Sequence, residues 1–169
     1  VSKVRQQAMI GVLADAMGDE PFCRALVKAI GSRRETPAEG GTLRFVPADA
    51  YDKVVGDALD GATPLRRLTT SSHSISLLGD TLVLKCYRRL QSGISAELEM
   101  GRFLTDVAGY RHCVPLAGSM AFHARDGTVW PLALLQAQVV HQGHAWTFTV
   151  DQLARLLERE DPARLTDEP

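Results

Sequence analysis

The stretch that decides the fold is Thr81-Leu-Val-Leu-Lys85-Cys-Tyr-Arg-Arg-Leu90, which is followed by Ser95-Ala-Glu97-Leu-Glu99-Met-Gly-Arg-Phe-Leu104. The first segment is an apolar run that carries a single lysine, Lys85. Side chains alternate along a strand, so Val83, Lys85 and Tyr87 are expected on one face. A lysine is costly to bury alone, because burial removes the water that solvates its charge. The segment therefore predicts a half-buried strand whose lysine needs a partner.

Two carboxylates of the second segment, Glu97 and Glu99, are candidate partners for Lys85. Both fall in the first turn of a helix expected over residues 95–108, where the helix dipole favours negative charge even without a lysine. The spacing does not separate them, because they flank the apolar stripe of this helix from opposite sides. A lysine that reaches water from the strand end is the alternative. The apolar stripe, expected to face the core, consists of Met100, Phe103, Leu104 and Val107.

The residues around this pair have the pattern of a small antiparallel sheet. Gly79-Asp80 and Asp126-Gly127 are dipeptides typical of tight hairpin turns. The order of elements is three strands, one helix and two strands, as in the N-terminal lobe of protein kinases. In that lobe a strand lysine held by a helix glutamate binds the phosphates of ATP. The candidate strands are 65–72, 74–78 and 81–87 before the helix, and 118–125 and 128–140 after it.

The flanking regions have a mostly helical pattern. Turn residues around 60–64 indicate a boundary between the first 63 residues and the lobe. After the lobe we expect a helix over 146–158 and then a polar tail. The elements expected before the boundary are a helix at 4–17, a helix at 20–30 capped by Asp19, a polar loop at 32–41, a strand at 42–46 and a weak helix at 48–59.

Composition restricts the class of protein. Of the 169 residues, 45% are hydrophobic and 23% charged, as is ordinary for a globular protein, and 19 basic residues nearly balance 20 acidic ones. That balance argues against a nucleic-acid binder. No apolar run is long enough to span a bilayer, and nothing at the start resembles a signal peptide. We expect a cytoplasmic protein with reduced thiols at Cys23, Cys86 and Cys113, cut from a longer chain, since its first residue is Val1.

Two polar clusters are candidate binding sites. The turn that contains Ser72, His73 and Ser74 can offer hydroxyl and backbone N–H groups to phosphates, although it contains no glycine. A solvated turn is an equally good interpretation of the same residues. His141 and His144 are spaced like a metal pair, but no third ligand accompanies them, so we do not expect a metal site there.

Seven segments together carry a family resemblance. They are Lys85-Cys-Tyr-Arg-Arg-Leu90, Glu97-Leu-Glu-Met-Gly-Arg-Phe-Leu104, Val114-Pro-Leu-Ala-Gly118, Leu134-Leu-Gln136, Gln142-Gly-His-Ala-Trp-Thr147, Phe22-Cys-Arg-Ala-Leu-Val-Lys-Ala-Ile30 and Gly40-Gly-Thr-Leu-Arg-Phe-Val-Pro47. They resemble bacterial maltokinases, both the free-standing enzymes and those fused to trehalose synthase. The resemblance covers most of residues 4–158.

The resemblance implies an α+β fold of the aminoglycoside-phosphotransferase type. It implies a partial cap region at 1–63, a kinase-like N-lobe at 64–158, and a tail at 159–169 that leads toward a C-lobe outside this chain. The implied reaction transfers the γ-phosphate of ATP to the anomeric hydroxyl of maltose. The products are ADP and maltose 1-phosphate, in trehalose and glucan (glycogen) metabolism. The implied cofactors are ATP and Mg²⁺, with the Mg²⁺ ligands in the C-lobe, and a trehalose synthase domain or subunit is an implied partner.

The resemblance also assigns roles to individual residues. Lys85 corresponds to the ATP lysine and Glu99 to its helix partner. The backbone of Gln136 to Gln138 corresponds to the hinge that meets adenine. Val83 lies at the edge of the nucleotide cleft, and Ser72, His73 and Ser74 form the phosphate-side turn, in which the family usually has asparagine where His73 stands.

The catalytic residues of this family lie in its C-lobe. We therefore expect none in this chain, and no phosphoryl transfer by the chain alone. The rival hypothesis is a non-catalytic lobe remnant that binds a partner protein instead of nucleotide. We also expect Val83 and Leu135 to face water partly beside Gln136–Val139, and so to promote self-association.

Overall fold

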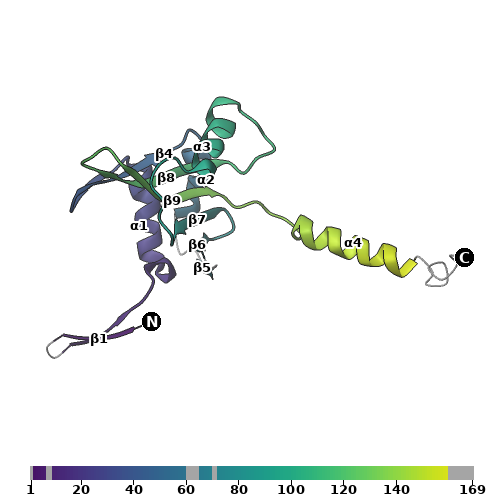
Figure 1. The fold of residues 1–169 in the computed structure, drawn as a ribbon, viewed down its shortest axis with the longest axis horizontal. Helices are drawn as coiled ribbons and strands as arrows, with labels where there is room; N and C mark the ends of the chain where they lie inside the picture. Colours follow the sequence, from purple (N-terminus) through teal and green to yellow (C-terminus); the bar gives the residue numbers. More distant parts are fainter. Residues whose placement is uncertain (1, 7–8, 60–64, 70–71, 160–169) are drawn as a thin grey trace, which may run out of the picture. The chain divides into compact units, whose positions relative to one another are not determined.

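The computed structural model describes residues 2–6, 9–59, 65–69 and 72–159. The chain is an α+β protein (Figure 1), and it divides into two compact units, residues 1–139 and 140–169. The described part of the first unit holds a seven-stranded antiparallel sheet in the order β3-β4-β8-β9-β7-β6-β5 and a separate hairpin, β1-β2. The described strands are β1 Ser2–Gln6, β2 Met9–Leu13, β3 Glu35–Ala38, β4 Gly41–Pro47, β5 Leu65–Thr69, β6 His73–Leu78, β7 Leu82–Tyr87, β8 Leu116–Ala124 and β9 Val129–Ala137.

Four α-helices occur in the described residues: α1 Glu20–Gly31, α2 Tyr51–Val55, α3 Ala96–Arg102 and α4 Ala145–Arg159. Short 3-10 turns lie at Ala16–Gly18 (η1) and Gly56–Leu59 (η2), and a π-helical turn at Phe103–Val107 (η3) continues α3. The expected cap of α1 is confirmed, because the Asp19 carboxylate accepts a hydrogen bond of 2.7 Å from the N–H of Phe22.

Both predicted hairpin turns are confirmed. A turn at Gly79-Asp80 joins β6 to β7. The turn between β8 and β9 contains Gly127 at φ +88°, a backbone conformation that glycine adopts without strain. The expected strands before and after the helix are present as β5 to β9, except that residues 70–71 lie outside the described part.

The helix expected over residues 4–17 was wrong. The structure has the β1-β2 hairpin there, in which Ser2 lies opposite Leu13 and Gln6 opposite Met9. Gly11 and the β-branched Val4, Ile10 and Val12 lower helix propensity, whereas β-branched side chains suit a strand.

The loop expected over residues 32–41 is also partly strand, because Glu35–Ala38 pairs with β4 as an edge strand. Pro37 is tolerated at this edge since an edge strand leaves some N–H groups without sheet partners. The expected boundary at 60–64 lies outside the described residues. Strands from both sides of it, β4 and β5, belong to the same sheet.

The strands of the sheet present alternate residues to two separate apolar clusters. On β7, Leu82 and Leu84 are fully buried in the larger cluster, to which α1 contributes. Tyr87, on the opposite face of β7, packs against the smaller cluster together with Leu98 of α3. The larger cluster consists of Met17, Cys23, Val27, Ala29, Ile30, Phe45, Val55, Leu78, Leu82, Leu84, Ala117 and Leu135. The smaller one consists of Ala48, Leu116 and Leu134. Neighbouring side chains on a strand point to opposite faces. Because Leu84 points into the larger cluster, Lys85 points to the face that α3 covers.

The inward face of α3 differs from the expected one. Met100, Phe103 and Val107 are 51%, 50% and 72% exposed, so these three residues of the predicted apolar stripe do not face the core, whereas Leu104 is half-buried. Instead Leu98 packs on the smaller cluster, Gly101 lies over Leu116, and the Thr105 hydroxyl accepts a hydrogen bond of 3.1 Å from the Leu116 N–H. Gly101 and Thr105 therefore lie on the side of α3 that faces β8.

Candidate functional site

Lys85 and Glu97 form an ion pair between β7 and α3. The Lys85 Nζ atom lies 2.8 Å from both carboxylate oxygens of Glu97. The lysine side chain is 17% exposed and the glutamate side chain 42%. Both charges are therefore paired, and the carboxylate keeps contact with water. This arrangement holds an ammonium group at a defined position on one face of the sheet.

The start of α3 explains why Glu97 reaches the strand. Ser95 precedes the helix with an extended backbone, and its side chain caps the N–H of Leu98 at 3.4 Å. Glu97 then falls in the first turn, where the helix dipole stabilises its charge.

The expectation that Glu99 pairs with Lys85 was wrong. Two residues correspond to about 200° of rotation around an α-helix, so Glu97 and Glu99 cannot both point at the same strand. Glu99 instead lines a cleft of about 740 Å³ between α3 and the β8-β9 hairpin. The sequence spacing alone could not decide between the two, because the rotation of α3 about its axis is set by its packing on β8.

Tyr87 belongs to the site; alternation along the strand predicts its face correctly but indicates no role for it. Its hydroxyl donates a hydrogen bond of 3.1 Å to Glu97 Oε2 and lies 3.4 Å from the Ser95 hydroxyl. The Lys85 ammonium lies 5.8 Å from the centre of the Tyr87 ring, within reach of a cation–π contact. Burial, together with the negative charge of Glu97, raises the pKa of Tyr87 to about 12. The phenol is therefore protonated at neutral pH and acts as a donor.

The three polar residues expected at the phosphate-side turn divide between the two faces of the sheet. His73 lies opposite Tyr87 in the β6-β7 pairing, and their rings are 5.4 Å apart. The Ser72 hydroxyl lies 2.7 Å from His73 Nδ1. Ser74 is buried and donates its hydroxyl to Asp15 at 2.8 Å. The structure therefore places His73 on the Lys85 face and directs the Ser74 hydroxyl to the opposite face.

The residues expected near adenine lie along β7 and β9. Val83 lies opposite Gln136, so the two side chains share the Lys85 face of the sheet. The backbone N–H of Gln138 donates to the carbonyl of Thr81 at 2.7 Å, which holds the end of β9 beside the start of β7. Val83, Lys85 and Gln136 are therefore brought together, and Gln138 follows at the edge.

The exposure expected for Val83 and Leu135 was wrong. Val83 is 8% exposed and Leu135 is fully buried. Leu135 points into the larger cluster beneath α1, and Val83 lies on a strand that has neighbours on both sides. Val83 and Leu135 therefore do not supply the exposed apolar surface that was expected to promote self-association. Val139, which follows β9, is 47% exposed.

Two cavities of the described residues lie beside α3. The cleft of about 740 Å³ runs between α3 and the β8-β9 turn and is mostly apolar, with Leu98, Phe103 and Val129 in its walls. A smaller cavity of about 280 Å³ lies between Tyr87 and the start of α3, and Arg89 and Gln91 give it a polar lining. Lys85 is among the lining residues of neither cavity.

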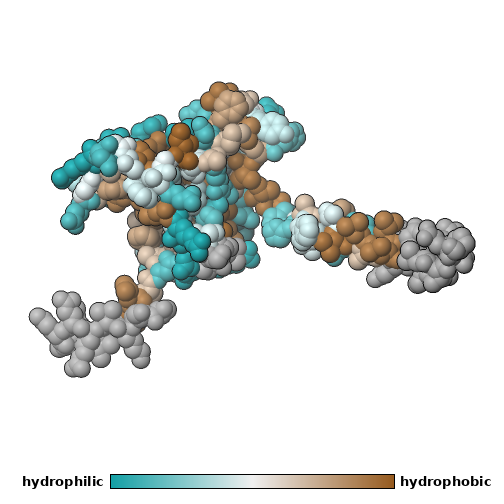
Figure 2. All heavy atoms as spheres, viewed as in Figure 1, coloured by the Kyte–Doolittle hydropathy of each residue, from teal (hydrophilic) through white to brown (hydrophobic). Residues whose placement is uncertain are grey.

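The second unit consists largely of α4. Trp146 and Phe148 are 79% and 65% exposed, and Figure 2 shows apolar side chains along this helix. The rings of His141 and His144 are 5.1 Å apart. Across the described residues, no three His, Cys, Asp or Glu side chains come together as a metal site.

No helix in the described part of the chain combines the length and apolar character needed to cross a membrane. The comparison with models of known protein families finds no match for this chain.

Proposed function

We propose that this chain forms the nucleotide-binding lobe of a maltokinase-like phosphotransferase, which transfers the γ-phosphate of ATP to maltose and yields maltose 1-phosphate and ADP. The observation that carries the proposal is the Lys85–Glu97 ion pair, in which a lysine on an inner strand is held by a carboxylate of the helix above it. An ion pair of this kind positions the phosphates of ATP in protein-kinase-like enzymes.

The sheet supports the same proposal. The five strands expected in the lobe, β5 to β9, are contiguous in the order β8-β9-β7-β6-β5. The lysine strand β7 lies in the middle of these five, and the helix α3 covers its lysine face. Strand β7 is paired with β9 on one edge and with β6 on the other, which fixes the backbone that carries Lys85.

In this proposal each residue has a physical task. The Lys85 ammonium neutralises negative charge on the phosphates, and Glu97 orients the ammonium. Tyr87 holds Glu97 by donating its hydroxyl to Oε2. Gln136, which lies opposite Val83 in the β7-β9 pairing, provides a polar contact for the adenine, beside the backbone that continues to Gln138.

The proposal assigns nucleotide binding to this chain and not the chemical step. Phosphoryl transfer requires a base, metal ligands and an acceptor site positioned together. The described residues do not fit a Mg²⁺ site, because no three potential ligands converge, and we assign Mg²⁺ no ligand here.

A nucleotide titration tests the proposal. The full chain is titrated with ATP in a calorimeter, alongside Lys85→Met and the matched control Lys28→Met, which removes an exposed lysine of α1. Saturable binding that Lys85→Met weakens at least ten-fold, and that Lys28→Met leaves unchanged, supports the proposal. Absence of saturable binding, or equal binding by all three proteins, contradicts it.

The apolar cleft beside α3 favours a second candidate function, a lobe remnant that binds a partner protein and no nucleotide. Phe103 and Val107 are exposed beside this cleft, and contiguous exposed apolar surface is typical of interaction sites. The ATP titration described above distinguishes the two candidate functions, because only the nucleotide-binding lobe predicts ATP binding that depends on Lys85.

A further inference from the structure

The apolar cleft between α3 and the β8-β9 hairpin has no role in the proposed nucleotide binding. Neither Lys85 nor Glu97 is among its described lining residues. Its volume of about 740 Å³ lies within the range of roughly 300–1,000 Å³ that is usual for small-molecule sites in proteins. The large apolar side chains of its walls are Ile94, Leu98, Phe103, Val107, Val129 and Pro131.

Contacts within the chain hold the walls of this cleft in place. The loop before α3 is tied to β9, because the N–H of Gly93 donates a hydrogen bond of 2.8 Å to the carbonyl of Val129. On the helix side, Leu98 packs on the smaller cluster, and the Thr105 hydroxyl accepts a hydrogen bond from the Leu116 N–H. Loop, helix and hairpin therefore bound the cleft on three sides. A site that is already formed loses little conformational freedom when a ligand binds.

The charges beside the cleft are unevenly balanced. Glu99 and Arg102 are the charged residues in its described lining. The Arg102 Nε atom lies 4.0 Å from Oδ2 of Asp106, whose side chain is 13% exposed, so Arg102 has a counter-ion one turn further along the helix. The Glu99 carboxylate forms no hydrogen bond or ion pair with any residue in the described part of the chain. The charge left to attract a ligand is therefore negative.

We propose that this cleft is a binding site for a small amphipathic cation, whose alkyl or aromatic body lies between α3 and the β8-β9 hairpin and whose cationic group pairs with Glu99. Apolar walls remove the body of such a ligand from water, and they strengthen the attraction of the carboxylate for a positive charge by excluding part of the water around it. The inference concerns a site that Lys85 does not line, so it is independent of ATP binding.

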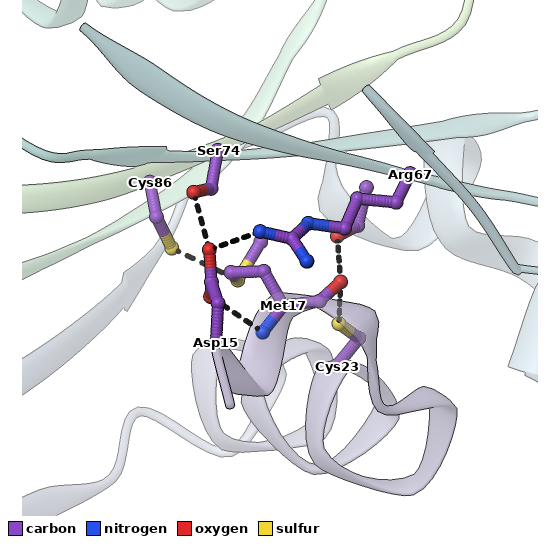
Figure 3. A network of polar contacts seen from close by, with 7 residues as sticks. Asp15, Met17, Cys23, Arg67, Ser74 and Cys86 are labelled. Carbon is purple, nitrogen blue, oxygen red and sulfur yellow. Dashed lines mark hydrogen bonds and ion pairs between the residues drawn. The ribbon is translucent and has the colours of Figure 1, made fainter. Parts of the chain in front are cut away.

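The opposite face of the sheet offers a matched control position (Figure 3). There the turn η1 is held to the sheet by Asp15, which pairs with Arg67 of β5 at 2.6 Å, and by Met17, whose sulfur lies 3.3 Å from the Cys86 thiol of β7. Phe22 follows this turn at the start of α1 and is 41% exposed, close to the 50% of Phe103. The same substitution can therefore be made at a phenylalanine of similar exposure away from the cleft.

The test uses three probes that share a decyl chain and differ in charge. Decylamine is cationic at neutral pH, decanoate is anionic and decanol is neutral. Each is titrated into the full chain below its solubility limit and its aggregation concentration, with calorimetry for the affinity and backbone amide NMR for the location. We expect decylamine to bind tightest, with shifts of the amide signals concentrated in residues 92–107 and 127–129.

Four variants assign the contacts. Phe103→Gln removes an apolar wall and should weaken all three probes about five-fold or more, because part of the buried apolar area is lost. Phe22→Gln makes the same change on the other face and should leave the affinities unchanged. Val107→Gln, at a position 72% exposed, repeats the first change if Phe103→Gln does not fold. Glu99→Gln should weaken decylamine about five-fold, as expected for an ion pair with a partly exposed partner, and leave decanol unchanged.

The outcomes separate the parts of the inference. Decylamine binding that Phe103→Gln and Glu99→Gln weaken, and that Phe22→Gln does not, supports it. Tighter binding of decanoate would show that Arg102 sets the selectivity, and equal binding of all three probes would show that no charge does; either result overturns the cationic class. Absence of saturable binding by every probe overturns the site itself and favours a partner protein as the occupant of the cleft. None of these titrations contains ATP, so their failure is distinct from a failure of the proposed function.

Discussion

The Tyr87 hydroxyl and the Glu97 carboxylate are joined by a hydrogen bond of 3.1 Å, to the same carboxylate that binds the ammonium of Lys85. Glu97 thus has two partners on β7, one neutral and one charged. A carboxylate with a fixed second partner keeps its orientation when the lysine turns toward another anion. The bond therefore pre-organises the lysine position.

Replacing Tyr87 with phenylalanine should weaken ATP binding while the fold is retained. The change removes one hydrogen bond to a partly exposed carboxylate, worth about 1 kcal/mol, which corresponds to about five-fold in affinity. Tyr51→Phe is the matched control, because the Tyr51 hydroxyl bonds to the carbonyl of Val27, away from Lys85. Calorimetric titration of both variants measures the effect, and equal affinities in the two would contradict a role for Tyr87.

The stability of the fold should decrease in strongly alkaline solution because of Tyr87. Its pKa is raised from about 10 to about 12 in the folded state, so the folded chain retains this proton more tightly than the unfolded chain does. The resulting stabilisation is fully present below pH 10 and is lost as the pH rises from about 10 through about 12. Urea unfolding across this range should show a smaller loss for Tyr87→Phe than for the wild type. A parallel loss in the two proteins would show that Tyr87 does not contribute.

Gly118→Ala should destabilise the fold by about 1–3 kcal/mol, the usual cost of inserting a methyl group into a packed core. A Cβ atom at Gly118 would overlap the side chain of Ile30 and lie 2.8 Å from the carbonyl oxygen of Val46. At Gly101 the nearest atom would be 3.7 Å away, an ordinary contact, and alanine there favours the helix. Gly101→Ala should therefore be neutral or stabilising. Thermal unfolding of both variants tests the pair, and a stable Gly118→Ala would mean that α1 packs more loosely on β8.

The three free thiols should react at different rates. Burial raises the pKa of the Cys86 thiol to about 12 and also raises that of Cys23, so few thiolate ions form at either position near neutral pH. Cys113 lies in the connection before β8 and is partly exposed. Alkylation with iodoacetamide at pH 8, followed by peptide mass analysis, should modify Cys113 first. Early modification of Cys86 would show that η1 opens readily from the sheet.

Local chemistry made several elements predictable. The Asp19 cap and the glycine-containing turns at residues 79–80 and 126–127 depend on neighbours within a few residues, and each was found where the sequence indicated. The strand around Lys85 was predictable for the same reason, because alternation along one strand separates Leu84 from Lys85. The β1-β2 hairpin was not predictable in this way. Its apolar residues recur every three or four positions, and this spacing is also typical of a helix.

By itself, then, the sequence determined the α+β class, the two hairpins of the sheet and the presence of a lysine on a half-buried strand, because propensity, capping and turn geometry act over short distances. Only the tertiary structure decided that Glu97 and not Glu99 binds that lysine, that α3 turns Leu98 and Gly101 inward, and that Asp15 reaches Arg67 across 52 positions of the chain. These features depend on the rotation and placement of elements far apart in sequence. Packing against β8 and burial in the larger cluster set that placement, and no local pattern encodes it.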